Sequence, residues 1–547
     1  MSIPTALFKR RRGREVSASA RYAVRRAGGA VTSLMARRSS GKSGAGRLLL
    51  RRRRDEDRIS ALPDDLLLLI LRRLDTRSAL GTGSLSRRWA HLPRELAALG
   101  LRAGDMLPPR YHRWVQLYNN IRTTVTVPHY RRPLLPIIRR YERRAMRAFT
   151  SSTESLLEEP RRRVERLSLE FFITGNAGRM NRLLAEAVDG WGVEDLEAVA
   201  KPTFRREGEG DVHTFPSHGL CKEPRASRLR SLKLAGCVLP PALHEHGALT
   251  MLILQGVPES TPAEAYEHIF TLCPQLQTLH LISCGCRTNK GMPLIVEVDA
   301  PSSQIRELVV QNCTFRHILL KALPRLQRLA SLQSRVSFES SSFPHLSQRN
   351  LTMRLGVEGL NCHLKVELDM FLECTPDVRS LIIRLTGPYR WIVPSSSPSE
   401  FLPGLRRLLV ADVPLSWDVT WPRLLLEMAP SLETLHVHIL PSNGKEEPGE
   451  EIPWSPTELR QHHLKEFVVA GFQGTARQIC LIKFVVEVCA ALCRLAMFKN
   501  GHVRYKGHWD WEVVTKEQSW SDDEKGTTLK QIMGVVSSAA PVQLVLG

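Results

Sequence analysis

The sequence of 547 residues lacks any hydrophobic run long enough to cross a membrane. The longest one, Leu66 to Leu71, is far shorter than the roughly 18–20 apolar residues that a membrane-spanning helix needs. The chain also has no cysteine before Cys221 and no secretory signal pattern, although eleven cysteines follow. A disulfide framework is therefore disfavoured, and we expect the chain in the reducing environment of the nucleus or cytoplasm.

Acidic residues are nearly missing from residues 1–54. This segment has sixteen Lys and Arg and a single acid, Glu15, so it accounts for 15 of the 22 net positive charges. The remainder of the chain is only mildly basic, which argues against a body that binds nucleic acid. The composition of the segment is typical of a disordered arm, a nuclear-import signal or an organelle transit peptide, and it does not separate the three.

Catalytic and cofactor-binding motifs are missing as well. No Gly-x-Ser-x-Gly, His-Glu-x-x-His, Walker or dinucleotide-binding pattern stands in a credible setting. Cys284 and Cys286 form a close pair, but no second Cys/His pair lies at the spacing of a zinc site. We therefore predict a non-enzymatic chain with no cofactor and no metal.

Residues 55–99 carry the most specific local pattern. Pro63 suits the first position of a helix, and Asp64 and Asp65 place negative charge at its positive end. The apolar run that follows predicts a helix buried on several sides, which so short a unit does not achieve alone. We expect a second helix, capped by Ser84, with one apolar face formed by Leu85, Trp89 and Leu92. The pattern predicts a small helical module that needs a partner.

Three stretches of this module match a known motif: Arg58-Ile59-Ser60, Leu62-Pro63 with the Leu/Ile helix after it, and Leu85-Ser86-Arg87-Arg88-Trp89. Together they resemble the F-box of plant F-box/leucine-rich-repeat proteins. The resemblance implies a three-helix module that docks on a Skp-type adaptor and, through it, on a cullin and a RING protein. Motif positions that usually meet the adaptor fall on Leu62 and Pro63. Positions shared between core and adaptor interface fall on Ile59, Leu66, Ile70, Leu71, Leu74, Leu85 and Trp89.

The module departs from the family in its second half. The family usually has Thr-Ser before the Leu-Ser-Arg-Arg-Trp stretch, whereas here Thr82 is followed by Gly83, and Gly81 stands just ahead. Each Gly within a helix costs about 0.5–1 kcal/mol relative to Ala. We therefore expect the second helix to be short or frayed.

A pattern of the form Leu-x-x-Leu-x-Leu recurs after residue 160. Nearly complete copies, each followed by Cys, begin at Leu229, Leu276 and Ile305. Others begin at Leu249, Val378, Leu405 and Leu432, and weaker ones at Val164, Leu326 and Leu464. Successive copies often begin 27 to 29 residues apart, which is typical of leucine-rich repeats. The spacing is irregular between Val164 and Leu229 and between Leu326 and Val378, so insertions or further degenerate repeats are expected there.

The repeats predict an α/β fold, in which a short helical F-box is followed by a leucine-rich-repeat solenoid with one strand and one helix or loop per repeat. Alternate strand residues point into the core, and the Cys closes the turn from inside. The other strand residues face outward on the concave surface, where such solenoids usually hold partners. Candidate target-binding residues there are Lys233, Ile253, His280, Glu307, Gln311, Arg407, His436 and His438.

Residues 464–498 predict a strand, a Gly-Phe-x-Gly turn and a helix with Ile479, Ile482, Val485, Val486, Cys489 and Leu492 along one side. This segment resembles the FBD-type C-terminal region of many plant F-box proteins, although Arg477-Gln478 stand where the family often has an acid. The predicted organisation is a basic arm (1–54), F-box (55–99), helical connection (100–160), repeats (161–460), FBD-like cap (461–500) and a peripheral tail (501–547).

These features favour a substrate-recognition subunit of an SCF-type cullin–RING ubiquitin ligase. Its F-box would bind the Skp-type adaptor, its repeats would bind an unknown target protein, and neither a membrane nor nucleic acid is expected as a partner. Two alternatives stay open. One is a basic repeat protein associated with nucleic acid, and the other is an F-box scaffold that assembles no ligase.

Overall fold

The computed structural model describes residues 59, 62–124, 133–158, 163–175, 177–204, 212–288, 290–339, 343–354, 366–367, 377–386, 392–393, 402–413, 425–440, 459–515, 520–536 and 542–547. The predicted basic arm lies outside them. Residues up to Leu62 and residues from Pro63 form separate units. In the first unit the Leu62 N–H donates to the Ile59 carbonyl at 3.1 Å. No helix within these ranges is long and apolar enough to cross a membrane.

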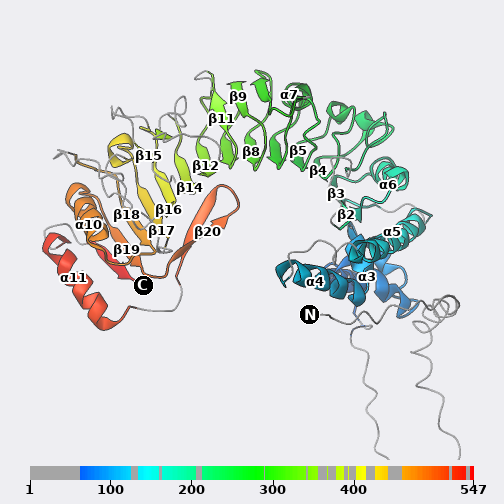
Figure 1. The fold of residues 1–547 in the computed structure, drawn as a ribbon, viewed down its shortest axis with the longest axis horizontal. Coiled ribbons are helices and arrows are strands. Elements are labelled where there is room, and N and C mark those ends of the chain that lie inside the picture. Colours follow the sequence, from blue (N-terminus) through cyan, green and yellow to red (C-terminus); the bar gives the residue numbers. More distant parts are fainter. Residues whose placement is uncertain are drawn as a thin grey trace, which may run out of the picture. The chain divides into compact units, whose positions relative to one another are not determined.

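One parallel sheet of 15 strands organises the second unit (Figure 1). The strands lie side by side in the order in which they occur along the chain. The strands are β1 (Ala98–Arg102), β2 (Arg166–Phe172), β3 (Asp195–Lys201), β4 (Ser231–Ala235), β5 (Met251–Gln255), β6 (Thr278–Ile282), β8 (Glu307–Gln311), β10 (Arg328–Leu332), β12 (Gln348–Arg354), β14 (Ser380–Thr386), β16 (Arg407–Val413), β17 (Thr434–Ile439), β18 (Glu466–Ala470), β19 (Arg494–Phe498) and β22 (Gln543–Leu546).

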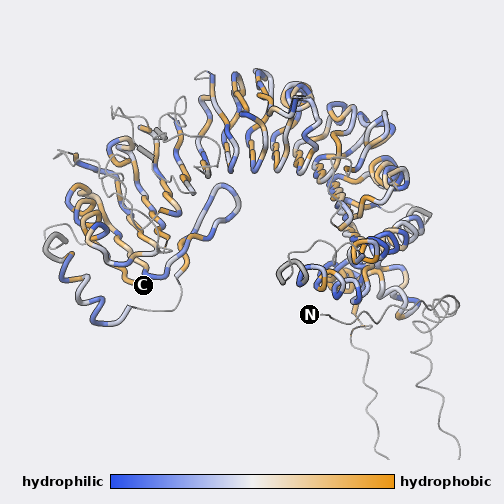
Figure 2. Tube along the Cα trace, viewed as in Figure 1, coloured by the Kyte–Doolittle hydropathy of each residue, from blue (hydrophilic) through white to orange (hydrophobic). Residues whose placement is uncertain are grey.

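The leucine pattern forms these strands because alternate side chains face one buried side. Leu232 and Leu234 of β4 and their partners in register, Leu252 and Leu254 of β5, are all buried. The hydrophobic stretches of the chain accordingly follow the strands (Figure 2). Each predicted repeat start from residue 164 onward leads into a strand of the sheet, which confirms the fold class. The two irregular intervals contain degenerate repeats, since β3 lies in the first and β12 in the second.

A backbone hydrogen bond repeats at the end of successive strands. The residue after the strand has a left-handed backbone, and its N–H donates to a carbonyl of the next strand in the sheet. Gly236 donates in this way to Gln255 at 2.8 Å, and Gly256 to Ile282 at 2.8 Å. The same bond is made by Ser283, Asn312, Gln333 and Gly471. This bond turns the chain out of the sheet at the same level in each repeat.

The return segments cover the buried side of the sheet. Some are helices: α6 (Ala177–Asp189), α7 (Ala263–Leu272), α10 (Ala476–Val488), η5 (Pro224–Ala226) and η6 (Leu243–Glu245). Others are strands, which form a three-stranded sheet of β7 (Ile295–Asp299), β9 (His317–Ala322) and β11 (Val336–Phe338), and a pair of β13 (Val366–Glu367) and β15 (Ile392–Val393). Of the predicted turn cysteines, Cys237 and Cys284 are buried and Cys313 is half-buried. The Cys284 thiol donates to the Leu254 carbonyl at 3.4 Å.

Helices of different lengths begin the second unit. They are α2 (Asp64–Leu71), α3 (Thr76–Gly81), η1 (Thr82–Ser84) and η2 (Leu92–Glu95), followed after β1 by η3 (Ala103–Met106), α4 (Pro109–Thr124) and α5 (Leu134–Glu158). The expected helix capped by Ser84 is wrong, because residues 85–91 form turns and the Ser84 hydroxyl donates back to the Gly81 carbonyl at 2.8 Å. Gly81 and Gly83 weaken helix propagation at this point. The helix expected to be short or frayed is thus absent from residues 85–91, and only the 3-10 turn η1 directly precedes them.

The C-terminal region continues the sheet. Residues 464–498 form β18, α10 and β19, and the six residues predicted along one side of the helix are buried. Residues 501–547 are not peripheral. They contain a hairpin of β20 (His502–Lys506) and β21 (Asp510–Val514), the helix α11 (Asp522–Val536), which packs on α10, and β22, which pairs with β19.

The left-handed position after the strand gives a testable stability difference. Gly236 (φ +63°) and Gly256 (φ +60°) have the same backbone, but a Cβ on Gly236 would collide with the Ala200 carbonyl oxygen, whereas the nearest atom for Gly256 is 3.9 Å away. We expect Gly256→Ala to cost about 1–2 kcal/mol, the usual penalty of this backbone for a residue with a Cβ, and Gly236→Ala to cost clearly more. Urea denaturation measures both, and equal losses would contradict the collision.

A buried histidine predicts a pH dependence of stability. His213 lies between the rings of Phe171 and Phe215, and its Nε2 is 2.8 Å from Asn181 Oδ1. Burial lowers the pKa of His213 to about 4. The folded chain therefore favours the neutral ring, and this contribution is complete above about pH 6.5 and is lost as the pH falls toward 4. We expect His213 to account for about 2 kcal/mol of destabilisation between pH 7 and pH 5. In urea denaturation His213→Gln should show a smaller pH dependence than the wild type, and an equal dependence would refute this assignment.

Candidate functional site

Helix α2 presents apolar side chains to solvent on one side. Leu66, Leu69 and Ile70 are 45%, 53% and 41% exposed, and Leu74 follows them at 43%. These four residues form what we call the α2 surface. Large apolar side chains exposed together on one element are typical of a protein interaction surface. Leu85, in the turn after η1, is exposed as well.

The opposite side of α2 belongs to the core. Leu67 and Leu71 are buried, and the helix packs against η2, where Leu92 is buried too. Trp89 is also buried, so Leu71 and Trp89 contribute to the core among the residues predicted to meet the adaptor. The exposed members of that predicted set are Ile59, Pro63, Leu66, Ile70, Leu74 and Leu85, while Leu62 is half-buried. The sequence analysis missed Leu69.

An ion pair ties the turn after η1 to the start of α2. The Arg88 guanidinium donates to Asp64 Oδ1 from Nη2 at 2.8 Å and from Nε at 3.1 Å, and His91 Nε2 lies 3.5 Å from Asp64 Oδ2. The hydrogen bond from Arg88 is the main reason that the pKa of Asp64 falls below its ordinary value. The pair is exposed and adds little to stability. It places a charged group beside the first turn of the helix.

The side of the large sheet that faces away from the return segments is called the strand face here. Its central row is in register across eleven strands: Ser168, Glu197, Lys233, Ile253, His280, Val309, Ala330, Asn350, Ile382, Leu409 and His436. The first five are half-buried, whereas the residues from Val309 to Leu409 are buried. The strand face therefore has an open section on β2–β6 and a covered section on β8–β16.

Charged side chains in the open section neutralise one another. Glu197 accepts hydrogen bonds from Lys233 Nζ at 2.5 Å and from the Ser168 hydroxyl at 2.8 Å. Burial acts to raise the pKa of Glu197, but these two hydrogen bonds outweigh it and lower the pKa. Lys201 and Glu170 pair at 2.6 Å in the same section. The predicted residue Lys233 is thus already paired, and Ile253 lies beside it in register.

The hairpin of β20 and β21 covers the other section. Trp511 is 4% exposed and packs against Ile382, Leu409 and Ala411. Its indole N–H donates to His436 Nδ1 at 2.9 Å. Arg407 lies over the indole, 4.6 Å from the ring centroid. The predicted residues Arg407 and His436 are therefore in contact with the hairpin.

The tip of the hairpin reaches further along the sheet. Asn350 Nδ2 donates to the His508 carbonyl at 2.8 Å, and the His508 ring lies edge-on to His280 at 5.7 Å between centroids. Arg328 lies over the Trp509 ring at 5.6 Å. Burial is the main cause of the lowered pKa of His508.

Glu307 joins the predicted histidine of β6 to the arginine of β10. It accepts from His280 Nε2 at 2.8 Å and pairs with Arg328 Nη2 at 2.7 Å. Burial acts to raise the pKa of Glu307, but the His280 hydrogen bond and the Arg328 charge lower it overall. Gln311, on the same strand, is half-buried, and its carbonyl accepts from the Ser283 N–H at 2.7 Å.

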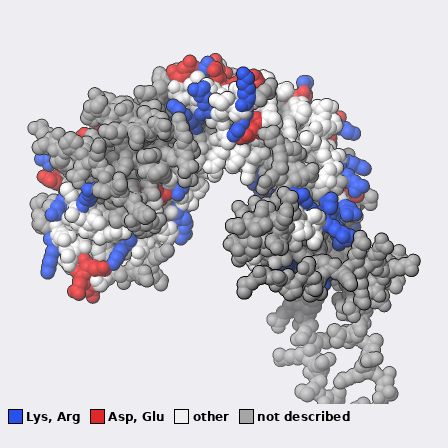
Figure 3. Space-filling model, in the orientation of Figure 1, with Lys and Arg blue, Asp and Glu red and all other residues white. Residues whose placement is uncertain are grey.

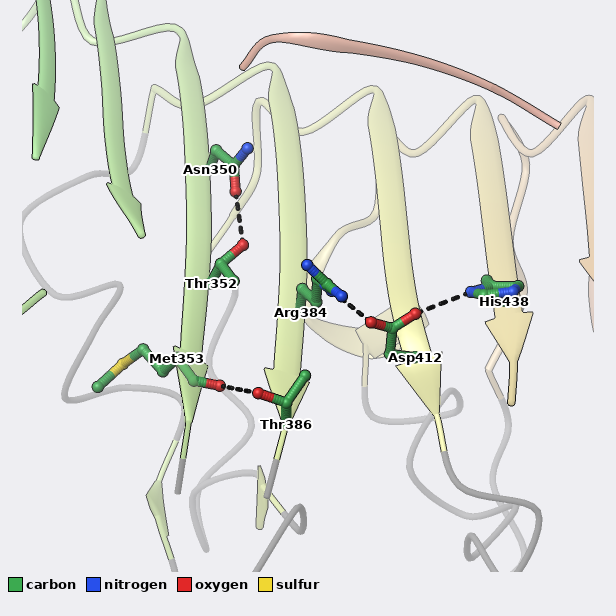
Figure 4. A network of polar contacts seen from close by, with 7 residues as sticks. All are labelled: Asn350, Thr352, Met353, Arg384, Thr386, Asp412 and His438. Atoms are coloured by element: carbon green, nitrogen blue, oxygen red, sulfur yellow. Dashed lines mark hydrogen bonds and ion pairs between the residues drawn. The ribbon is translucent and has the colours of Figure 1, made fainter. Parts of the chain in front are cut away.

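A polar cluster lies at the carboxyl ends of β14, β16 and β17 (Figure 4). The Asp412 carboxylate contacts the Arg384 guanidinium on one side and His438 Nδ1, at 3.0 Å, on the other. Burial acts to raise the pKa of Asp412, but hydrogen bonds to His438 and Arg384 outweigh it. The predicted residue His438 is buried in this cluster.

The sequence analysis missed the hairpin although a signal for it was present. Residues 503–513 alternate apolar and polar side chains on both sides of Gly507, as in Val503-Arg504-Tyr505 and Trp511-Glu512-Val513. The register pairs Val503 with Val513 and Tyr505 with Trp511, so the apolar side chains share one side. Such alternation around a glycine predicts a β-hairpin.

Among the residues with an assigned position, no three or more His, Cys, Asp and Glu gather in an arrangement that could hold a metal ion. The cysteines placed there are all free thiols, and burial raises the pKa of Cys286 to about 11. Six of these thiols, those of Cys221, Cys237, Cys273, Cys284, Cys286 and Cys489, are buried, whereas Cys480 and Cys493 are exposed.

Comparison with known proteins identifies two domains. Residues 59–96 match the F-box domain, and residues 162–515 match the LRR domain of the At1g61320/AtMIF1 type. The second match includes 461–500, the segment predicted as an FBD-like cap, and the hairpin. The chain is 23% identical over 273 residues to an F-box/LRR-repeat protein of Arabidopsis thaliana, a match that spans 49% of this chain and 50% of the relative. The chain is a plant-type F-box/LRR protein and belongs to the At1g61320/AtMIF1 leucine-rich-repeat family.

Proposed function

We propose that this protein is the substrate-recognition subunit of an SCF-type cullin–RING ubiquitin ligase. The α2 surface carries the proposal, because its exposed apolar residues fall within the matched F-box and include Leu66 and Ile70 of the predicted adaptor contacts. The protein would bind a Skp-type adaptor through this surface and a target protein through the strand face, in the nucleus or cytoplasm.

The exposed apolar side chains of the α2 surface would gain free energy if an adaptor buried them. Burial of an apolar side chain is worth about 25 cal/mol per Å² of surface removed from water, and a few central side chains usually dominate an interface. Leu66, Leu69 and Ile70 are held in place by a helix whose other side is core. The Asp64–Arg88 pair supplies a polar rim.

The target would be ubiquitinated by proximity. A receptor that holds a target near the loaded ubiquitin-conjugating enzyme raises the effective concentration of the reacting groups. This role requires surfaces rather than a reactive side chain. The open section of the strand face, with Lys233 and Ile253, and the surroundings of the hairpin are the candidate target contacts.

Adaptor binding is tested by adding a charge to the α2 surface. We expect Ile70→Glu to reduce capture of a purified Skp-type adaptor at least tenfold in a pull-down, because an isolated carboxylate would be buried at the interface. Leu117→Glu is the matched control, since Leu117 is 44% exposed on α4 and Ile70 is 41% exposed on α2.

Full adaptor capture by Ile70→Glu would contradict the adaptor site, and equal loss in both variants would show a general effect on folding. Co-purification of the wild-type chain with cullin as well as adaptor separates a ligase subunit from an F-box scaffold that assembles no ligase. Adaptor without cullin would favour the scaffold.

A second candidate function rests on a basic surface. Lys and Arg gather over α5 and α6 (Figure 3). The exposed members are Arg140, Arg143, Arg144 and Arg147, at helical spacing on α5, and Arg179 and Arg182 on α6. An arginine stripe of this kind is able to meet phosphates, so it favours the nucleic-acid alternative.

We expect the arm, not this stripe, to dominate any binding to nucleic acid. Removal of residues 1–54 should abolish salt-sensitive binding of a labelled DNA duplex, because this segment carries 15 of the 22 net charges. Replacement of Arg140, Arg143, Arg144 and Arg147 by Gln in the full chain should leave binding within about twofold. Fluorescence anisotropy at two salt concentrations measures both. Strong salt-sensitive binding by the truncated chain would favour the nucleic-acid function.

A further inference from the structure

Trp511 lies in a site on the strand face, here called the seat, which consists of Ile382, Leu409, Ala411, Arg407 and His436. These residues make three kinds of contact with the indole. Ile382, Leu409 and Ala411 form an apolar floor from β14 and β16. His436 accepts the indole N–H at 2.9 Å, and its ring lies edge-on to the indole at 5.9 Å between centroids. Arg407 covers the indole face at 4.6 Å. A phenyl ring would leave the His436 acceptor unused, so the seat favours an indole over a phenyl ring.

The residue before the indole is recognised separately. Arg407 Nη2 pairs with Asp510 Oδ1 at 3.0 Å, so one guanidinium contacts both Asp510 and Trp511. The hydrogen bond from Arg407 is the main cause of the lowered pKa of Asp510. A cationic residue at this position would be repelled by Arg407. The seat therefore recognises an acidic residue followed by Trp.

His436 presents one ring nitrogen to the indole as a hydrogen-bond acceptor. Because the indole N–H donates to Nδ1, the ring carries its proton on Nε2, which faces Glu466 Oε1 at 3.8 Å. Glu466 is itself paired with Arg494 at 2.7 Å. A charged pair from β18 and β19 thus lies near the Nε2 edge of the ring, while Nδ1 meets the indole.

The hairpin that fills the seat is not part of the large sheet. β20 and β21 form a sheet of their own, with β-ladder hydrogen bonds to each other. A two-stranded hairpin is marginally stable alone, so its position depends on the strand face beneath it. Its outer side is exposed at His502, Arg504 and Lys506. The hairpin therefore occupies the strand face as a ligand would.

We propose that this seat is a recognition site for target segments with an acidic residue followed by Trp, and that Asp510-Trp511 occupies it in cis. This inference rests on the proposed function, in which the strand face binds the target. The seat consists of Ile382, Leu409 and Ala411 with Arg407 and His436. A target segment binds there when it displaces the hairpin.

The covalent link makes the hairpin a strong competitor. A tethered occupant has an effective concentration in the millimolar range, so a segment in trans binds weakly until the cis occupant is removed. The hairpin thereby raises the affinity that a target needs, and selects targets that also contact the open section of the strand face.

The test uses the full chain and a fluorescent peptide with residues 501–515 of its own sequence, GHVRYKGHWDWEVVT. We expect Trp511→Ala to bind this peptide at least tenfold more tightly than the wild type in fluorescence anisotropy, because the cis occupant has lost its indole. His502→Ala is the control, since His502 lies on the exposed outer side of the hairpin and its replacement should leave the wild-type affinity unchanged. A peptide with Ala in place of its second Trp should bind at least tenfold more weakly to Trp511→Ala.

A second variant protects the test against misfolding. Asp510→Lys keeps the indole but places a cation beside Arg407, and we expect it to tighten peptide binding about threefold. If neither variant binds the peptide better than the wild type, the hairpin is a fixed part of the fold and the proposal is overturned. Adaptor pull-down with the same proteins reports separately on the proposed function, because the α2 surface and the seat share no residue.

Discussion

The in-phase register of the parallel strands is the constraint on which the rest of the structure depends. Each strand pairs with the next repeat at the same level, and the left-handed residue after the strand bonds to that neighbour. Residues far apart in the chain are thereby aligned in rows. Ile382 and Leu409 become neighbours because β14 and β16 share this register. The floor beneath Trp511 is a consequence of the backbone ladder, not of local sequence.

The sequence predicts the repeats where the inner positions are leucine and fails where they are not. On β12 the inner position that pairs with Leu381 is Arg349, which is buried with its guanidinium 5.0 Å from the Phe338 ring centroid. A polar residue at this position hides the repeat from a hydrophobic pattern. The repeat survives because the stack supplies backbone partners on both sides and an aromatic ring for the cation.

The F-box was recognisable because its motif is local, but the motif does not separate core from surface. Leu67 and Leu71 are one helical turn apart and both face the core, whereas Leu66 and Ile70 share the exposed side. An unbroken apolar run marks neither side with a polar residue. The helical phase follows only from the contact with η2, a tertiary contact. The weakening of the second helix was predictable, since glycine acts on the local backbone, but its replacement by turns over residues 85–91 was not.

The hairpin shows what sequence patterns leave out. Its hydrogen bonds to the strand face join residues 75 to 158 positions apart, and the outward strand positions that they use have no shared side-chain chemistry. The repeat pattern therefore predicts that the strand face is equally open to a partner along the whole sheet. The structure divides this surface into an open section, whose charged side chains pair with one another, and a covered section, on which the hairpin of β20 and β21 already lies. Since the open ion pairs are already satisfied, an indole seat with a fixed acceptor discriminates more sharply between partners than Lys233 or Glu197 does.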